Sequence, residues 1–400
     1  MPAARSRLGI IFLTVLIDLI GFGIIIPNLP YYAQRMGAGG FGLGALLGAY
    51  SLMQFLATAI LGRTSDRVGR RPVLLATMLC NAVGYVLFAA AGSYGLLLLA
   101  RVVSGFAGGN ISAAQAYIAD ITPPAERSRG MGVIGAAFGL GFILGPALGG
   151  LAAHYLGPRT PGLVAAALSL ANFVSAYAIL PESLRKEHRT ERPLLDFSHI
   201  GSAVRDPKLG PLMAAWGIAP FAFSGYSVAL PLWAGVRFGW QEQQLAWLFT
   251  AIGATAALVQ GYLFGKLARR VGDRALLVAG AFGMALGIAV VPMIGTTLTL
   301  YIWTVELAFA NSIFGPAASG LVSRFAEPTE QGAVLGAAQA LSALGRLAGP
   351  IGIGWIYDAS RAAAFWSAGA AMAVGGASTL RVPAPDPAPA ATDAESATRV

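Results

Sequence analysis

Residues 62–75 read GRTSDRVGRRPVLL and residues 265–278 read GKLARRVGDRALLV, so one pattern recurs 203 positions along the chain. Two further matches keep almost the same offset. GPALGG at 145–150 pairs with GPIGIG at 349–354, and Ile26-Pro27 pairs with Leu230-Pro231. The chain is therefore predicted to consist of two related halves. Internal repeats of this kind are typical of secondary transporters, which hold their substrate between the halves near the middle of the bilayer.

The composition indicates a membrane protein. Of the 400 residues, 56% are hydrophobic and 11% are charged, whereas a soluble domain carries about 25% charged residues. The net charge is +9, but the basic residues lie between apolar stretches, as in membrane proteins, which argues against nucleic acid as a partner. Cys80 is the single cysteine, and His154, His188 and His199 share no motif, so no metal or other cofactor is expected.

Twelve apolar stretches are long enough to cross about 30 Å of hydrocarbon as helices. They are predicted at 8–33, 42–63, 72–92, 94–119, 129–156, 162–181, 208–234, 243–267, 274–292, 296–323, 332–357 and 362–381. The predicted fold class is therefore an all-α membrane protein with twelve transmembrane helices in two pseudo-symmetric six-helix bundles. The predicted domains are an N-terminal bundle at 1–181, a cytoplasmic linker at 182–207, a C-terminal bundle at 208–382 and a disordered, Pro/Ala-rich tail at 383–400.

The basic residues also predict the orientation of the chain. If both termini are cytoplasmic, the outer side holds only Arg35, Arg159, Arg237 and Arg361, and nearly all other lysines and arginines are cytoplasmic. This asymmetry predicts a multi-pass protein of a bacterial inner (cytoplasmic) membrane. A monomer surrounded by the lipid bilayer is expected.

Four segments carry a resemblance to a known family. GRTSDRVGRR at 62–71 matches the loop motif between spans two and three of the major facilitator superfamily, and RVVSGFAGG at 101–109 resembles its fourth-span motif. GFILGPALGG at 141–150 resembles the fifth-span motif of antiporters, and DLIGFGIIIPNLP at 18–30 is similar to the first span of drug:proton antiporters, especially tetracycline exporters. The resemblance implies a gating motif of Gly62, Asp66, Arg67, Gly69, Arg70 and Arg71, and an antiporter motif of Gly141, Gly145, Pro146, Gly149 and Gly150.

The chain also departs from the tetracycline exporters. Those proteins carry further acidic residues in spans three and nine, where this chain has Gly84 and Gly283. Because the missing acids serve proton or drug handling in the relatives, this difference argues against tetracycline as the substrate. In the second repeat of the loop motif, Arg269 replaces the acid of Asp66, an asymmetry that the tetracycline group shares.

Charged residues within spans are costly, about 2.5–3.5 kcal/mol or more at mid-depth, and they often mark ion or substrate pathways. Asp18 in span one and Glu306 in span ten are therefore candidate proton sites, although each is also compatible with a structural acid. Arg101 lies near one end of span four and could extend to the membrane interface, but the family pattern favours it as a buried partner of a proton-carrying acid such as Asp18. Two roles are open for Arg346: binding an anionic substrate group, or pairing with Glu306.

We expect the gating motif and the antiporter motif to have mainly conformational roles. Asp66 is expected near a helix junction, where a carboxylate can accept hydrogen bonds from a helix N-terminus and pair with Arg67 or Arg70 in one conformational state. The alternative is that these arginines only set topology. Glycines four residues apart in the antiporter motif allow close helix packing, and Pro146 is expected to bend its helix.

Several polar and aromatic residues are candidates for lining a substrate cavity, because rings and a few hydrogen-bonding groups suit an amphipathic molecule. They are Gln54, Asn110, Gln115, Trp216, Tyr226, Trp233, Trp303, Asn311, Gln339 and Arg346. The alternative for Trp and Tyr near span ends is anchoring at the membrane interface.

Taken as a whole, the sequence predicts a secondary active transporter that exports amphipathic small molecules in exchange for protons. The first alternative is a metabolite or lipid transporter of the same fold with different coupling. The second is a non-transporting membrane receptor, which would have no need for Asp18 and Glu306. A membrane enzyme is not expected, because no motif assembles a nucleophile, a base and an orienting group.

Overall fold

The computed structural model describes residues 2–123, 127–184, 201, 204–326 and 331–383, and the regular structure in these ranges is helical. The first half contains α1 (Pro2–Ile25), α2 (Leu29–Arg35), α3 (Gly40–Val68), α4 (Arg70–Ala90), α5 (Tyr94–Ala107), η1 (Gly108–Asn110), α6 (Ile111–Ile121), α7 (Arg127–Leu156) and α8 (Thr160–Ile179). The second half contains α10 (Gly210–Phe238), α11 (Glu242–Leu258), η4 (Val259–Leu263), α12 (Phe264–Val271), α13 (Asp273–Ala289), η5 (Val291–Met293), α14 (Thr297–Phe325), α15 (Gln331–Ala359) and α16 (Arg361–Thr379).

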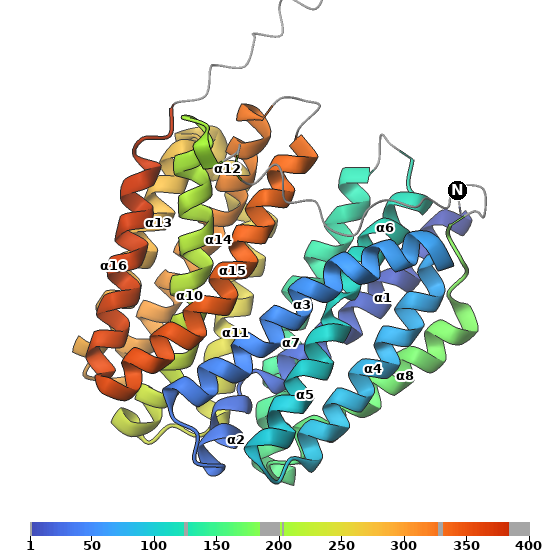
Figure 1. Ribbon diagram of the computed structural model, residues 1–400, viewed down its shortest axis with the longest axis horizontal. Helices are drawn as coiled ribbons and strands as arrows, with labels where there is room; N and C mark the ends of the chain where they lie inside the picture. The colour runs from blue at the N-terminus through green and yellow to red at the C-terminus, as the bar shows by residue number, and fades with distance from the viewer. Residues whose placement is uncertain (1, 124–126, 185–200, 202–203, 327–330, 384–400) are drawn as a thin grey trace, which may run out of the picture.

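These elements form twelve membrane-crossing units. One unit joins α5, η1 and α6, a second joins α11, η4 and α12, and α2 extends the unit that begins with α1. Within the described ranges, nine units have both the length and the apolar composition of a membrane span. The other three are α13, α15 and α16, which occupy predicted spans nine, eleven and twelve. The predicted fold class is confirmed, and the two halves lie side by side (Figure 1).

The two halves use the same helix pairing, because equivalent glycines lie at equivalent contacts. In the first half α1 packs against α7, and in the second half α10 packs against α15. A Cβ on Gly145 would lie 2.7 Å from the Cα of Gly23, and a Cβ on Gly349 would collide with the Phe221 carbonyl. The four-residue spacing of the antiporter motif therefore serves close packing: Gly141, Gly145 and Gly149 face α1, and Gly150 faces Ala246 of α11.

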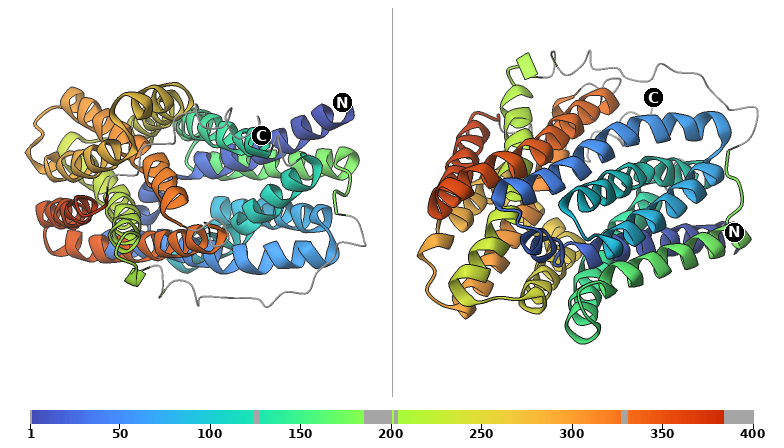
Figure 2. Two further views of the ribbon diagram at one scale, coloured as in Figure 1. Left: turned by 90° about the horizontal axis from the view of Figure 1, so that it is seen from above. Right: turned by 60° about the horizontal axis from the view of Figure 1, so that its bottom comes forward.

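The halves contact each other mainly through α3 with α15 and α7 with α11. Near the start of α3, Gly40 and Gly354 face each other without side chains between them, and Gly44 packs on the Pro350 carbonyl. We call this end of the molecule, which carries α2, the contact end. The opposite end carries the two repeated segments 62–75 and 265–278, and we call it the motif end. The halves diverge toward the motif end, as Figures 1 and 2 show.

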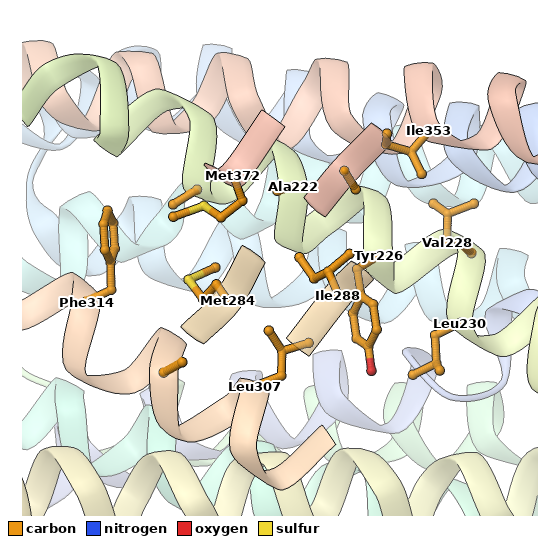
Figure 3. Packing of buried hydrophobic residues seen from close by; sticks show 14 of the residues in the cluster. Ala222, Tyr226, Val228, Leu230, Met284, Ile288, Leu307, Phe314, Ile353 and Met372 are labelled. Atoms are coloured by element: carbon orange, nitrogen blue, oxygen red, sulfur yellow. The ribbon is translucent and has the colours of Figure 1, made fainter. Parts of the chain in front are cut away.

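The hydrophobic core also joins the two halves at the contact end and is separate at the motif end. One large cluster joins the second half to the contact end of the first half, and it includes Ile24, Leu46 and Phe365. A separate cluster, which includes Met78 and Tyr117, fills the motif end of the first half alone. Figure 3 shows part of the large cluster, where Met284, Leu307 and Phe314 surround the space between α13 and α14.

Two predicted domains fall largely outside this description. Most of the linker at 182–207 and nearly all of the tail at 383–400 lie beyond the described ranges, so their predicted character remains a prediction.

Candidate substrate and proton site

A cavity of about 1180 Å³ lies between the two halves, and residues of both line it. The first half contributes α1, α3, α4, η1, α6 and α7, and the second half contributes one stretch of α15 from Gly336 to Arg346. The lining reaches from Phe22 near the contact end to Arg63 near the motif end. The cavity is therefore positioned as a substrate site between the halves, as the repeats predict.

Asp18 of α1 lines this cavity and is held by two buried amides. Asn110 Nδ2 donates to Asp18 Oδ2 at 2.6 Å, and Asn172 Nδ2 donates to Asp18 Oδ1 at 3.3 Å. Asn172 also donates to the Thr14 carbonyl at 2.9 Å, which fixes its orientation. Each carboxylate oxygen of Asp18 thus has a neutral donor from a different helix. The sequence prediction missed Asn172, although a polar residue in the middle of span six is a signal that could have found it.

The expected ion pair between Asp18 and Arg101 is not formed, so that part of the prediction is wrong for this conformation. The Arg101 guanidinium lies over the ring of Tyr50, with Cζ 4.3 Å from the ring centroid. Arg101 is only 3% exposed, and its Nε has no hydrogen-bond partner among the described residues. Tyr50 separates this cation from the cavity, because Tyr50 lines it and Arg101 does not.

Glu306 does not line the cavity. Its carboxyl group lies between α14 and α13, where Cβ atoms on Gly283 and Gly287 would lie 3.2 and 2.8 Å from its oxygens. Glu306 Oε2 is buried and has no hydrogen-bond partner in the described parts of the chain. The open alternative of an ion pair with Arg346 is not realised, because Arg346 lines the cavity and donates from Nη1 to Ser342 Oγ at 2.6 Å.

Half of the predicted cavity residues do line the cavity, namely Gln54, Asn110, Gln115, Gln339 and Arg346. The others do not: Trp216, Tyr226, Trp233, Trp303 and Asn311 lie outside the lining. Tyr226 is 2% exposed and its hydroxyl shares a 3.1 Å hydrogen bond with Thr304, while Trp233 packs edge-on against Phe365. These rings serve the core of the second half, and residue type alone gave no sign of which face of each helix they occupy.

The sequence prediction missed an aromatic group on the cavity wall. Phe22, Phe138 and Phe142 line the cavity together with Tyr50. Phe142 makes an edge-to-face contact with Phe22 at 6.0 Å and stacks on Phe138 at 6.3 Å. Phe22 contacts Tyr50 at 5.1 Å. Apolar rings within an apolar span give no sequence signal that separates a cavity wall from a lipid-facing surface.

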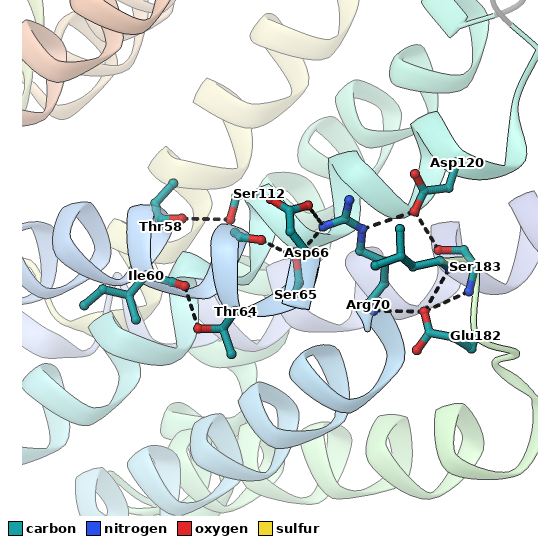
Figure 4. A network of polar contacts seen from close by, with 12 residues as sticks. Thr58, Ile60, Thr64, Ser65, Asp66, Arg70, Ser112, Asp120, Glu182 and Ser183 are labelled. Carbon is teal, nitrogen blue, oxygen red and sulfur yellow. Dashed lines mark hydrogen bonds and ion pairs between the residues drawn. The ribbon is translucent and has the colours of Figure 1, made fainter. Parts of the chain in front are cut away.

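At the motif end, Arg70 is the centre of a polar network in the first half (Figure 4). Arg70 forms an ion pair with Asp66 one turn earlier, donates from Nη1 to Ser65 Oγ at 2.7 Å, and contacts Asp120 Oδ2 from Nε at 3.1 Å. Gly69 has φ of +114°, a conformation that side-chain-bearing residues rarely adopt, and it lets α4 start directly after α3. Among the remaining motif residues, Gly62 packs against Ser112, and Arg67 is exposed.

The predicted capping role belongs to a different carboxylate. Asp66 was expected to accept from a helix N-terminus, but Glu182 accepts from Arg70 N at 2.9 Å and from Arg71 N at 3.2 Å, at the first turn of α4. Arg71 in turn donates from Nη2 to the Tyr177 carbonyl of α8 at 2.6 Å. Glu182 was assigned to the linker because it follows the last apolar residue of span six, and only the fold brings it to α4.

The contact end carries two polar contacts between the halves. Asp358 at the end of α15 accepts from Gly40 N at 2.6 Å and Phe41 N at 2.8 Å, so it caps α3 of the other half. Arg35 Nη2 lies 2.9 Å from Glu242 Oε1 at the start of α11. In both contacts the second half supplies the carboxylate. These contacts close the molecule on the side opposite to the motif end.

Two pseudo-symmetric helical bundles, with a central cavity and a partly buried acid on its wall, define the class of membrane transporters that work by moving two halves against each other. The chain belongs to the Major Facilitator Superfamily, whose family model matches residues 11–262 and 212–399.

Three similar proteins represent this family. The chain is 31% identical to the tetracycline resistance protein, class C, of Escherichia coli over 94% of both chains. It is 30% identical to the major facilitator superfamily domain-containing protein 10 of Mus musculus, over 89% of this chain and 88% of that protein. The crystal structure of the human organic anion transporter MFSD10 (TETRAN) superposes with a TM-score of 0.70 at 26% identity, and covers 95% of this chain and all of that one. The chain is therefore a multi-pass membrane transporter of small molecules and not an enzyme.

Proposed function

We propose that the protein exports amphipathic small molecules in exchange for protons, with the central cavity as the substrate site and Asp18 as the proton carrier. The observation that supports this most directly is the position of Asp18, the one carboxylate on the described cavity wall. A charged residue in a membrane-embedded cavity is costly, so its retention there favours a role in ion or substrate movement.

The contacts of Asp18 suggest how protonation is coupled to movement. Asn110 lies at the junction of η1 and α6, and Asn172 lies on α8, so Asp18 connects α1 to two neighbouring helices. Hydrogen bonds to an ionised carboxylate are roughly twice as strong as neutral ones. Protonation would weaken both contacts and loosen α1, which packs on α7 through the antiporter motif. Because α7 contacts α11 of the second half, a shift of α1 can be passed across the interface.

Glu306 receives no coupling role in this proposal. It faces α13 and is separated from the cavity, so a proton on Glu306 would change no contact between the halves. The orientation in the membrane, with the motif end toward the cytoplasm and both termini on that side, is part of the proposal and rests on the distribution of basic residues.

The proposal is tested with the full chain in proteoliposomes and in an efflux-deficient bacterium. Asp18→Asn keeps the shape of the side chain, removes the titratable group and is expected to abolish both drug resistance and substrate-driven proton movement at unchanged membrane abundance. Asp18→Glu, which retains a carboxyl group, is the matched control and is expected to keep part of both.

Two results would count against the proposal. Transport by Asp18→Asn with unchanged proton movement would remove Asp18 from the coupling step. Transport by the wild type without any proton movement would favour the second candidate, a metabolite or lipid transporter with different coupling, which the glycines at positions 84 and 283 favour.

A further inference from the structure

The charges on the cavity wall are unbalanced. Two cations, Arg63 and Arg346, line the cavity, whereas Asp18 is the single acid on its described wall. Both oxygens of Asp18 already accept hydrogen bonds from protein amides. Neither arginine forms an ion pair with a described carboxylate. The cavity therefore has an excess of positive charge that the described protein groups do not neutralise.

Arg346 is the cation best placed to meet a ligand. It lies on α15, and its one described hydrogen bond goes from Nη1 to Ser342 Oγ on the preceding turn. A guanidinium has five N–H donors in a planar fork that matches the two oxygens of a carboxylate or sulfonate. Most of the donors of Arg346 are thus available to the cavity. Arg63 adds a second unmet donor, since its Nη1 is buried without a hydrogen-bond partner among the described residues.

Three other described arginines, in contrast, have acidic partners. Arg70 has two acidic partners and a serine, Arg35 has Glu242, and Arg324 has Asp273. The buried Arg101 lacks a described acidic partner but lies over the ring of Tyr50, which lines the cavity. Arg101 therefore adds to the positive potential of the cavity without being able to reach a ligand directly.

The first half supplies an apolar surface to the same cavity. Phe22, Phe138 and Phe142 form a contiguous group of rings on α1 and α7, all in the first half. Arg346 belongs to the second half. A molecule with an aryl body against these rings and an acidic group on Arg346 would touch both halves at once, which is what a substrate must do to be carried by their relative movement.

We propose that the cavity selects amphipathic organic anions, with a carboxylate or sulfonate bound to Arg346, Arg63 as an auxiliary cation and an aryl group packed on Phe22, Phe138 and Phe142. This inference rests on the proposed function in that it names the substrate class of the same cavity. It assigns charge selection to Arg346 and leaves Asp18 to carry the proton, so the two charged groups have separate tasks.

The test is a binding experiment, which requires neither transport nor a proton gradient. Three probes share one aryl body: 2-naphthoylglycine is an anion, its primary amide is neutral, and N-(2-aminoethyl)-2-naphthamide is a cation. Binding is measured by equilibrium dialysis against the full chain in phosphatidylcholine nanodiscs, and empty nanodiscs are subtracted. We expect the wild type to bind the anion about tenfold or more tighter than the amide, because hydrogen bonds to charged groups are the strongest of the available contacts.

Variants locate the selectivity. Arg346→Gln is expected to remove the preference for the anion over the neutral amide, and an unfolding midpoint close to that of the wild type shows that the variant is folded. Arg346→Lys is expected to keep a reduced preference, because an ammonium retains the charge but not the planar fork. Arg63→Gln is expected to weaken binding of the anion less than Arg346→Gln does.

Three results would overturn the inference: tighter binding of the cation than of the anion, no preference among the probes, or an anion preference that survives Arg346→Gln. The outcome is independent of the proposed function. A selective binder that moves no protons would contradict only proton coupling, and a proton-coupled exporter that prefers the cation would contradict only the assignment of Arg346.

Discussion

The same ion pair occurs in the two halves with its charges exchanged. In the first half Arg70 at the start of α4 pairs with Asp120 at the end of α6, at 3.1 Å. In the second half the equivalent positions, 203 and 204 residues later, hold Asp273 at the start of α13 and Arg324 near the end of α14, also at 3.1 Å. The repeat has therefore kept the contact between two neighbouring helices while reversing which helix is positive.

A second contact occurs at equivalent positions in both halves, and an arginine is the donor in each. Arg71 donates to the Tyr177 carbonyl of α8, and Arg274 donates to the carbonyls of Leu380 and Val382 just after α16. In each half an arginine at the start of the third span thus binds backbone at the end of the last span. A carbonyl accepts only from a donor, so this arginine could not be exchanged for an acid in the way that the ion pair was.

The surroundings of the two ion pairs differ more than their geometry. The side chain of Arg70 is 8% exposed and has additional contacts with Asp66 and Ser65, whereas that of Arg324 is 55% exposed. The difference teaches that the arginine of the first half is buried within a network, whereas the arginine of the copy in the second half lies at the surface and pairs with a less exposed acid. Arg269 occupies the position equivalent to Asp66, so the second half lacks the second acid of this network.

The largest expected effect is a loss of stability when the charge of the buried Arg70 is removed. Arg70→Gln leaves Asp66 and Asp120 without their cation, and breaking a buried pair costs about 3–5 kcal/mol. Arg324→Gln is the matched control and is expected to cost about 0.2–1 kcal/mol, because the Arg324 guanidinium is largely exposed to solvent, which weakens its ion pair. The midpoints of thermal unfolding in one detergent measure both. Equal shifts would show that burial does not separate the two networks.

Exchanging the two charges of an ion pair is expected to have an intermediate effect on stability. The exchange is expected to be tolerated in the second half only. The double variant Asp273→Arg with Arg324→Asp places the polarity of the first half in the second, and it is expected to unfold at nearly the wild-type midpoint. The double variant Arg70→Asp with Asp120→Arg puts an acid next to Asp66 and is expected to lose about 1–3 kcal/mol. Four single variants complete the two cycles. Full rescue in the first half would mean that Asp66 does not contribute to the network.

The smallest expected effect concerns two carboxylates that cap helices. Glu182 caps α4 within one half, and Asp358 caps α3 across the halves. Losing a cap costs about 0.5–2 kcal/mol in either case, but the cost falls on different equilibria. Glu182→Ala is expected to lower the unfolding midpoint, and Asp358→Ala to populate a state in which the contact end opens.

Spin labels at the exposed positions Gln34 and Ala359, in a Cys80→Ser background, report the opening as a longer interlabel distance. Arg35→Gln removes the ion pair with Glu242 at the contact end and is expected to act in the same direction with about 0.2–1 kcal/mol, since Arg35 is exposed. An unchanged distance distribution in Asp358→Ala would show that glycine packing alone holds the contact end closed.

The features that the sequence predicted correctly are those that repeat along the chain. The offset of the motifs predicted two halves, the apolar stretches predicted twelve spans, and the glycine spacing predicted the close packing of α7. Each of these depends on local composition or on register, which the sequence carries directly. The family follows from the same motifs, because they are contiguous residues at helix ends and along helix faces.

The errors concern which way a helix faces. Asp18 and Glu306 give the same signal, an acid within an apolar span, yet Asp18 lines the cavity and Glu306 faces α13. Successive residues of a helix point about 100° apart, so a shift of two or three positions turns a side chain from the cavity to a neighbouring helix. With no strongly one-sided pattern in a membrane span, only the packing of neighbours fixes that rotation.

The sequence by itself thus determined the number of spans, their pairing into two halves and the family of the protein. The tertiary structure alone decided the partners of its charged groups: two asparagines for Asp18, a tyrosine ring for Arg101, Glu182 for the start of α4 and an unbalanced Arg346 on the cavity wall. The physical reason is that apolar periodicity and glycine spacing act within a helix, whereas electrostatic and hydrogen-bond partners are chosen between helices that are distant in sequence.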